Sequence, residues 1–308
     1  MKKIGLLFPG QGSQFTGMGM DFVESFPWAG EIYVKARTLL GFDLADVCFN
    51  GPDETLRQTR YTQPALVVHS AIAWRMLREK GVVPSASAGH SLGEFSALIA
   101  AGVFSFEAGL ELVRERARLM SETGIRHPGA MAAVIGLASE EVGAACREAE
   151  SSGAGPVTPA NLNSPEQTVI SGSKEGVARA SEIAKAKGAK RVMELAVSGA
   201  FHSPLVAEAA AEFGKLLAAS PFKKPSFPVY ANVSASPETD VETVRDLLSK
   251  QMTHPVRWIE TIRNMISGGV TTFYEVGPGK VLAGLVKRID KSAESFLVDT
   301  PEGIEALK

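Results

Sequence analysis

The stretch "AGHSLGEFSAL" at residues 88–98 carries the pattern Gly-x-Ser-x-Gly, with Gly89, Ser91 and Gly93 at its fixed positions. The preceding "PSASAGH" is made of small residues and predicts a short strand, and "LGEFSALIAAG" predicts a helix. A nucleophilic serine on a sharp strand-to-helix turn needs small residues on both sides, because backbone crowds backbone there. A helix N-terminus also favours negative charge that develops beside it. We therefore expect Ser91 to be a nucleophile rather than a chance match to a short pattern.

The elements around this turn alternate between strands and helices. "KIGLLFPG" predicts a buried first strand, residues 64–81 predict a helix with proline in its first turn, and Ser105 can cap a helix that follows it. Such alternation is typical of a parallel sheet with helices on its faces.

Residues 128–197 show a different order, which is strand, helix, strand, strand, helix, strand. This βαββαβ order is the signature of a ferredoxin-like unit. After it the first pattern resumes, with a helix from about residue 203, a strand "FPVYANV", helices over 240–252 and 257–267, and two more strands around a helix. We predict an α/β fold with a discontinuous large domain, residues 1–127 and 198–308, and an inserted small domain, residues 128–197.

The composition is that of an ordinary globular protein, with 45% hydrophobic and 21% charged residues and a formal net charge of −2. Nothing in this balance points to nucleic acid or to a membrane surface. The apolar run after Lys3 is too short for a signal peptide, and no stretch is long enough for a transmembrane helix. The two cysteines, Cys48 and Cys146, make neither a disulfide framework nor a zinc site. We expect a cytoplasmic protein with no bound metal.

A serine nucleophile needs a general base, and the chain offers five histidines. His90 adjoins Ser91 and should point elsewhere, and His69 lies among apolar residues of a helix. His127 and His254 each precede a proline and are typical of loops. His202 follows a predicted strand and precedes a helix, which is where sites assemble in α/β folds. By elimination it is the best candidate.

Arg116 lies in the middle of the apolar face of the helix that follows Ser105. Leu112, Val113, Leu119 and Met120 flank it at three and four residues on either side. A guanidinium directed inward is costly unless it is paired. The pattern fits equally well a structural ion pair with a buried acid and a clamp for a substrate carboxylate.

The loop "FPGQGSQFTGMGM" at residues 8–20 contains four glycines but matches no phosphate-binding pattern. Gln11, uncharged and placed after the first strand, suits a different task, which is to present donors to an oxyanion.

Taken together, these motifs make the chain similar to the malonyl-CoA:acyl-carrier-protein transacylases of type II fatty-acid synthesis, and to the acyltransferase domains of polyketide synthases. The resemblance runs nearly end to end, through "FPGQGSQ" (8–14), "TQPAL" (62–66), "GHSLGE" (89–94), "RARLM" (116–120), "NLNSPEQTVISG" (161–172), "FHSPL" (201–205), "QMTHPVRW" (251–258) and "VGPGKVLAGLVKRI" (276–289).

The resemblance implies an α/β-hydrolase-like large domain with a ferredoxin-like small domain. It implies that Ser91 accepts the acyl group and that His202 is the base. It further implies an oxyanion hole made by the Gln11 amide and the Leu92 N–H, and a carboxylate clamp at Arg116. Gln251, Phe201 and Met120 would support the site, and the bulk of Phe201 should disfavour methylmalonyl.

The activity implied is ping-pong transfer of malonyl from malonyl-CoA to the phosphopantetheine thiol of holo acyl carrier protein. No cofactor is expected, since coenzyme A is part of the substrate and phosphopantetheine belongs to the acceptor. We expect a monomer with no nucleic-acid or membrane partner. The alternatives are a serine thioesterase or esterase, an acyltransferase that supplies a polyketide pathway, and a non-catalytic subunit that binds carrier protein.

Overall fold

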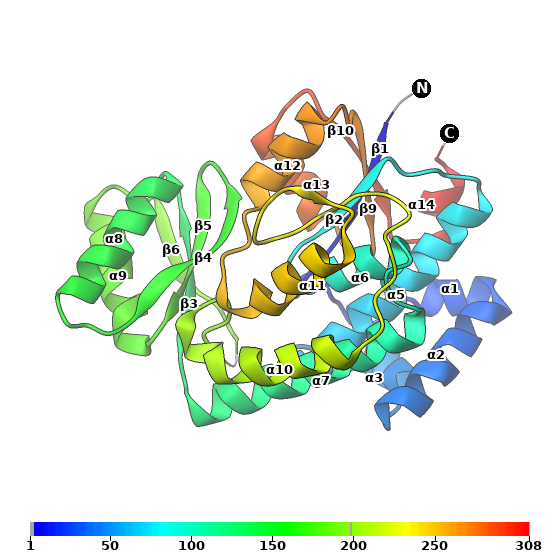
Figure 1. Cartoon of the computed structure of the whole chain (residues 1–308), viewed down its shortest axis with the longest axis horizontal. Coiled ribbons are helices and arrows are strands. Elements are labelled where there is room, and N and C mark those ends of the chain that lie inside the picture. Colours follow the sequence, from blue (N-terminus) through cyan, green and yellow to red (C-terminus); the bar gives the residue numbers. More distant parts are fainter. Residues whose placement is uncertain (1–2, 198, 308) are drawn as a thin grey trace.

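The computed structural model describes residues 3–197 and 199–307, which form an α/β fold with two sheets. Figure 1 shows the smaller sheet and its helices standing to the left of the larger one. The fold predicted from the sequence, a large α/β domain with a small ferredoxin-like domain, is confirmed.

The large sheet has six strands in the order β10-β9-β1-β2-β7-β8. All neighbouring strands are parallel except β8, which runs antiparallel to β7 at the edge. The strands are β1 Ile4–Phe8, β2 Ala86–Gly89, β7 Val229–Tyr230, β8 Pro237–Glu238, β9 Thr272–Val276 and β10 Glu294–Val298.

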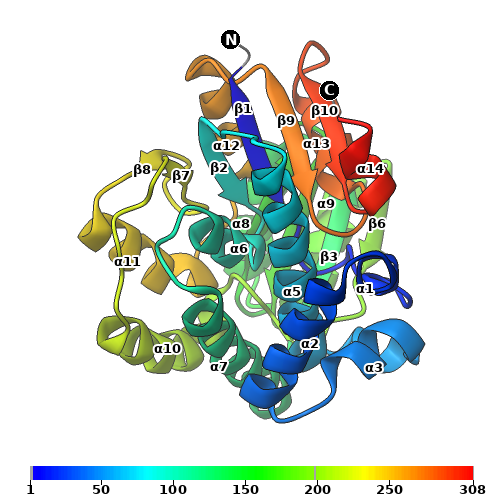
Figure 2. The ribbon, with the colours of Figure 1, turned by 90° about the vertical axis from the view of Figure 1, so that its right-hand side faces the viewer.

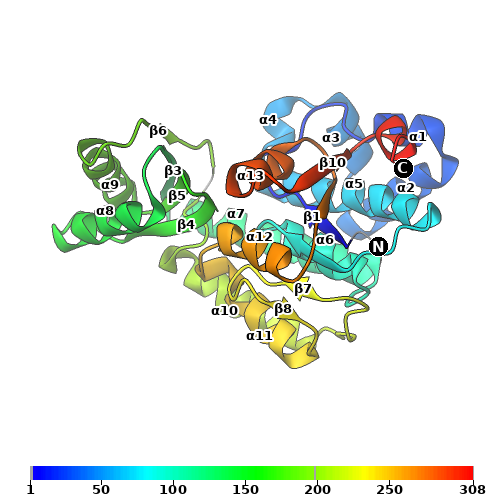
Figure 3. The ribbon, with the colours of Figure 1, turned by 90° about the horizontal axis from the view of Figure 1, so that it is seen from above.

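Helices cover both faces of this sheet, as a parallel sheet requires. Leu6 and Phe8 of β1 pack with α5, α6 and α7 on one face, and Leu7 packs with α12 and α13 on the other. Figures 2 and 3 show these two layers from the side and from above. The helices of this domain are α1 Met20–Ser25, α2 Pro27–Leu40, α3 Leu44–Asn50, α4 Asp53–Leu56, α5 Thr59–Glu79, α6 Gly93–Ala100, α7 Phe106–Arg126, α10 Ala207–Ala219, α11 Val241–Lys250, α12 Trp258–Ser267, α13 Val281–Ile289 and α14 Pro301–Glu305, with short 3₁₀ turns at Pro204–Val206 and Gln251–Thr253.

The small sheet is antiparallel, in the order β4-β5-β3-β6, and α8 and α9 pack on one of its faces. Its elements are β3 Ala130–Ile135, α8 Ser139–Ser151, β4 Val157–Ser164, β5 Gln167–Gly172, α9 Lys174–Ala186 and β6 Arg191–Glu194. They follow the βαββαβ order that the sequence predicts. The domain borders at 127/128 and 197/198 stay predictions, and Ser198 lies outside the described residues.

Some predicted boundaries in the large domain are wrong. Helix α5 begins at Thr59, so Pro64 lies inside it rather than at its first turn. Because Pro64 lies only one turn from that helix start, its missing N–H removes a single early hydrogen bond. The strand around residue 230 has two residues, and the helix predicted over 240–252 ends at Lys250, followed by a 3₁₀ turn. None of the helices formed by residues 3–197 and 199–307 is long and apolar enough to cross a membrane.

The two domains are joined by main-chain hydrogen bonds beside the large sheet. The Val256 N–H donates to the Ala160 carbonyl of β4 at 2.8 Å, and the Leu162 N–H donates to the Val256 carbonyl at 2.9 Å. This short parallel bridge fixes β4 of the small domain against the segment that leads into α12.

Candidate active site

Ser91 occupies the turn between β2 and α6, with φ of 52° in the left-handed region. That conformation is strained for a residue with a side chain, and such strain persists only where the surroundings enforce it. The Ser91 N–H donates to Asn232 Oδ1 at 2.8 Å, and Asn232 Nδ2 donates to the Gly89 carbonyl at 2.7 Å. Asn232 therefore ties the two sides of the turn together.

The two glycines of the motif are required by space. A Cβ at residue 89 would overlap the main-chain carbon and oxygen of Gly93. A Cβ at residue 93 would overlap the Phe8 carbonyl oxygen at the end of β1. The pattern Gly-x-Ser-x-Gly thus marks a place where three backbone segments approach one another closely. The Ser91 side chain is directed away from this packed turn.

His202 lies against Ser91, with 2.7 Å between its Nε2 and the serine Oγ. Its Nδ1 lies 2.9 Å from the Gln251 carbonyl oxygen and 3.0 Å from the His254 carbonyl oxygen. Both partners are acceptors, so Nδ1 carries the proton and Nε2 is left free to accept from the Ser91 hydroxyl.

The His202 imidazole is held neutral. Burial, followed by the nearby positive charge of Arg116, lowers its pKa to about 3. A neutral imidazole that accepts from a serine hydroxyl has the protonation state of a general base. His202 also has a positive φ, 56°, so both members of the pair stand on strained backbone.

Arg116 projects inward from α7 and is 1% exposed. Its Nη1 donates to Gln63 Oε1 at 2.8 Å, and its Nη2 donates to Gln251 Oε1 at 3.0 Å and to Ser91 Oγ at 3.3 Å. Its Nε has no hydrogen-bond partner in the described part of the chain. Burial lowers its pKa to about 10, so the side chain remains a cation at neutral pH. Among the described residues no carboxylate contacts it, which disfavours the structural ion pair.

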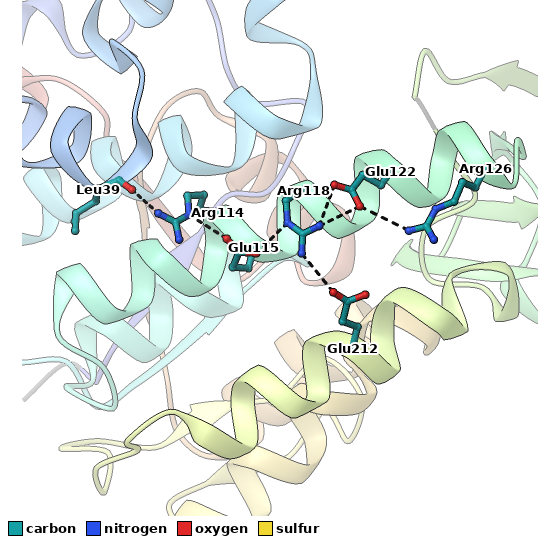
Figure 4. A network of polar contacts seen from close by, with 7 residues as sticks. All are labelled: Leu39, Arg114, Glu115, Arg118, Glu122, Arg126 and Glu212. Carbon is teal, nitrogen blue, oxygen red and sulfur yellow. Dashed lines mark hydrogen bonds and ion pairs between the residues drawn. The ribbon is translucent and has the colours of Figure 1, made fainter.

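In contrast to the buried Arg116, the charged side chains on the outer face of α7 pair with one another at the surface. Figure 4 shows a chain of polar contacts on that face, which joins Leu39, Arg114, Glu115, Arg118, Glu122, Arg126 and Glu212. Most of these side chains are substantially exposed, and such pairs contribute little to stability. The helix thus separates its solvated charges from the single charge directed at Ser91.

Two further donors border the serine. The Leu92 N–H at the start of α6 has no hydrogen-bond partner among residues 3–197 and 199–307. Within the described residues, the hydrogen bonds of the Gln11 side chain are long contacts of 3.4 and 3.5 Å with the Thr59 hydroxyl. Both residues line the cavity that contains Ser91.

The cavity over Ser91 has a volume of about 100 Å³. Its walls include Met120 and Phe201, which are buried, together with Met131, Leu195 and Val197. A cavity of about 410 Å³ adjoins it between α13 and the small sheet, and the two share Gln11, His90, Asn161 and Leu195. A still larger hollow of about 810 Å³ lies on the outer side of α7, but Ser91 and His202 do not border it. The chemistry, rather than the size of the hollow, therefore locates the site.

The structure brings together all the residues predicted for the site: Gln11, Ser91, Leu92, Arg116, Met120, Phe201, His202 and Gln251. His69 is buried beside Phe22, as expected of a core histidine. In the part of the chain that the structure describes, no group of three or more His, Cys, Asp or Glu could hold a metal ion.

Sequence reasoning missed four contributors: Gln63, Glu94, Asn232 and the main-chain carbonyl of His254. Glu94 had a detectable signal, because it is an acid within the apolar helix "GEFSALIA", the same signal that singles out Arg116. Gln63, Asn232 and the His254 carbonyl act through hydrogen bonds between segments that are distant in the sequence. No local sequence pattern distinguishes them.

The model of the acyl transferase domain family matches residues 6–300 of the chain. The malonyl CoA-acyl carrier protein transacylase of Bacillus subtilis strain 168 is 44% identical over 305 residues, which cover 99% of this chain and 96% of that protein. The protein of the same name from Escherichia coli K12 is 42% identical over 307 residues, 99% of each chain.

Solved structures agree with these relatives. An acyl carrier protein S-malonyltransferase from Vibrio cholerae superposes with a TM-score of 0.95 at 42% identity, over 99% of this chain and 100% of that one. A malonyl-transacylase in complex with its type II polyketide-synthase acyl-carrier protein gives a TM-score of 0.94, also at 42% identity, over 98% of each chain.

Proposed function

The chain belongs to the acyl transferase domain family, and from that premise we propose that it moves malonyl groups from malonyl-CoA to acyl carrier protein for fatty-acid synthesis. The observation that carries the substrate assignment is the buried Arg116 cation beside the Ser91 hydroxyl, with no carboxylate of the described chain against it. A malonyl thioester has a free carboxylate two carbons away from its reacting carbonyl. That acid can bind the guanidinium while the carbonyl carbon faces Ser91.

The first half of the proposed reaction acylates the serine. His202 Nε2 takes the hydroxyl proton as Ser91 Oγ attacks the thioester carbonyl carbon. The oxyanion of the tetrahedral intermediate accepts from the Gln11 amide and the Leu92 N–H. When the intermediate collapses, the carbon–sulfur bond breaks and the imidazolium returns its proton to the departing coenzyme A thiolate.

The second half reverses these steps with a new acceptor. The malonyl-serine ester keeps its carboxylate on Arg116 while the phosphopantetheine thiol of acyl carrier protein enters. His202 takes the thiol proton and the sulfur attacks the ester carbonyl carbon. The bond between that carbon and Ser91 Oγ then breaks, and the proton returns from His202 to Ser91 Oγ. Gln251 supports both halves, since its carbonyl orients His202 and its side-chain oxygen orients Arg116. Phe201 and Met120 shape the cavity around the acyl group.

The thioesterase and esterase alternatives are less well supported. In those enzymes an acid usually follows the serine in the chain and orients the histidine. Here the Nδ1 of His202 faces two main-chain carbonyls instead. A non-catalytic subunit would not need the 2.7 Å contact between Ser91 and His202. The polyketide alternative differs only in the pathway that consumes the product.

We further propose that the protein acts as a cytoplasmic monomer, needs no cofactor, and has neither nucleic-acid nor membrane partners. The support for the compartment is that Cys48 and Cys146 are both free and buried, as in proteins of reducing compartments. Size-exclusion chromatography with light scattering tests the oligomeric state directly.

The experiment that tests the function is intact-mass spectrometry after brief exposure to malonyl-CoA without carrier protein. We expect a malonyl adduct on the wild type, none on Ser91→Ala, and loss of the adduct when holo acyl carrier protein is added. Acetyl-CoA, which lacks the carboxylate, should label the protein far more slowly. Immediate release of free malonate with no adduct would instead make water the preferred acceptor and support a hydrolase.

A further inference from the structure

Glu94 is a buried acid that the proposed mechanism does not use. It lies in the first turn of α6, three residues after Ser91, and is 3% exposed. Its Oε2 accepts from Gln251 Nε2 at 2.8 Å and from the Asn232 main-chain N–H at 3.3 Å. No lysine, arginine or histidine of the described chain forms an ion pair with it, so this carboxyl is held by neutral donors alone. Burial raises its pKa to about 7.

A single amide stands between this acid and Arg116. The Gln251 side chain donates to Glu94 Oε2 through its nitrogen and accepts from Arg116 Nη2 at 3.0 Å through its oxygen. The nitrogen also donates to the Ser91 carbonyl oxygen at 2.7 Å. The Glu94 carboxyl, the Gln251 amide and the Arg116 guanidinium thus form a hydrogen-bonded chain beside Ser91, called the relay below.

This relay fixes which way the amide points. With Glu94 ionised, reversing the Gln251 amide would turn its oxygen toward two acceptors, Glu94 Oε2 and the Ser91 carbonyl, and its NH₂ group toward Arg116, which is only a donor. Every one of the three contacts would then fail. The acceptor oxygens therefore hold the Gln251 oxygen toward the guanidinium.

The separation also leaves the cation available. A carboxylate in direct contact would occupy the Arg116 donors and compete with an incoming acid. Placed one amide away, the Glu94 charge still raises the pKa of Arg116 but takes none of its N–H groups.

We propose that Glu94 is a positioning residue for recognition of the substrate carboxylate, acting through Gln251 on the orientation of Arg116. This inference rests on the proposed malonyl transfer. It concerns selectivity between acyl groups, because a neutral acyl group does not bind the guanidinium and is insensitive to where it points.

The test uses two variants that separate the position of the Glu94 carboxylate oxygen from its negative charge. Glu94→Asp keeps the acid but withdraws the oxygen by one methylene from Gln251. Glu94→Gln removes the charge but keeps an oxygen that the two donors, Gln251 Nε2 and Asn232 N–H, hold in place. The readout is kcat/KM for serine acylation by malonyl-CoA and by acetyl-CoA, measured with the full chain, and their ratio.

We expect Glu94→Asp to lower the malonyl-to-acetyl ratio about tenfold, mainly through KM for malonyl-CoA, as loss of one hydrogen bond to a charged group implies. Glu94→Gln should retain the ratio within about threefold. Glu115→Ala is the matched control, since Glu115 adjoins Arg116 in the chain but pairs on the outer face of α7, and it should leave the ratio unchanged.

Three results would overturn the proposal: no change in either rate in Glu94→Asp, an equal fall of the malonyl-CoA and acetyl-CoA rates in Glu94→Asp, or a loss of the ratio in Glu94→Gln as large as in Glu94→Asp. Urea unfolding of each variant shows whether it is folded. If one of the two variants does not fold, the other still tests the proposal by itself. Failure of the wild type to form any malonyl adduct would refute the proposed function instead, and that outcome is distinct from all three.

Discussion

Replacing Arg116 by alanine should convert an acid-selective acyltransferase into one that discriminates poorly. The guanidinium has five N–H donors in all. Three contacts within the described chain use some of them, to Gln63, Gln251 and, at a long 3.3 Å, Ser91. The buried Nε has no partner among residues 3–197 and 199–307, so donors remain for a substrate carboxylate.

The magnitude follows from the hydrogen bonds that the substrate would lose. Two hydrogen bonds to a charged group, each contributing about 1.5–3 kcal/mol, give roughly 3–6 kcal/mol when they act on one carboxylate. At about 1.4 kcal/mol for each factor of ten, kcat/KM for malonyl-CoA should fall roughly 10²- to 10⁴-fold. Acetyl-CoA makes neither bond, so its kcat/KM should stay within about threefold of the wild-type value.

Serine acylation is measured by rapid quench and intact mass with each donor, which excludes carrier-protein binding from the result. Arg118→Ala is the matched control, because Arg118 lies two residues away on the same helix and pairs outward with Glu122. It should leave both rates unchanged. An equal loss for malonyl-CoA and acetyl-CoA in Arg116→Ala would refute the clamp and make Arg116 a structural residue.

Three other predictions follow from single features of the structure. Gly89→Ala should destabilise the fold by at least about 3 kcal/mol, because its Cβ overlaps main-chain atoms, and a preserved urea midpoint would contradict this. His202, with its pKa lowered to about 3, should stay neutral down to pH 5, so the acylation rate should show no loss from its protonation between pH 7 and 5; a fall centred near 6.5 would be inconsistent. Since the unfolded imidazole binds its proton near pH 6.5, the stability that neutral His202 contributes is full above that pH and is lost toward pH 3, which urea titrations can follow. Glu275→Ala should lower thermal stability by about 1–3 kcal/mol, because the buried carboxylate accepts from two N–H groups at the start of α13; no change in melting temperature would show that water replaces it.

The sharp turn that carries Ser91 could be predicted from the sequence because its requirements are local. Gly89 and Gly93 lie within two residues of Ser91, and a short strand and a helix flank them. The inward charge of Arg116 could be predicted for a similar reason, since helical periodicity alone places it among apolar neighbours. Its two open interpretations could not be separated in that way, because the choice depends on which residues lie opposite.

The residues that orient the site could not be predicted because they come from distant parts of the chain. Asn232 lies 141 positions from Ser91, and Gln251 lies 135 positions from Arg116. The His254 carbonyl belongs to a segment typical of a loop, and any residue type could supply it. Elimination among the histidines singled out His202, which the structure places against Ser91, but it could not give the pair of carbonyls that sets its tautomer.

The same arrangement explains why a buried cation can serve binding rather than stability. Arg116 is desolvated as the chain folds, and neutral amides take up part of the hydrogen bonding that water would supply. A substrate carboxylate therefore meets a cation that has already lost its water, so their attraction is not offset by a second desolvation of the arginine. If a protein carboxylate stood where the Gln251 amide stands, the pair would be satisfied internally and an acid would gain little by entering. The neutral ligands of Arg116, with the acid one residue further back, are thus the physical reason to expect selectivity for acyl groups that end in a carboxylate.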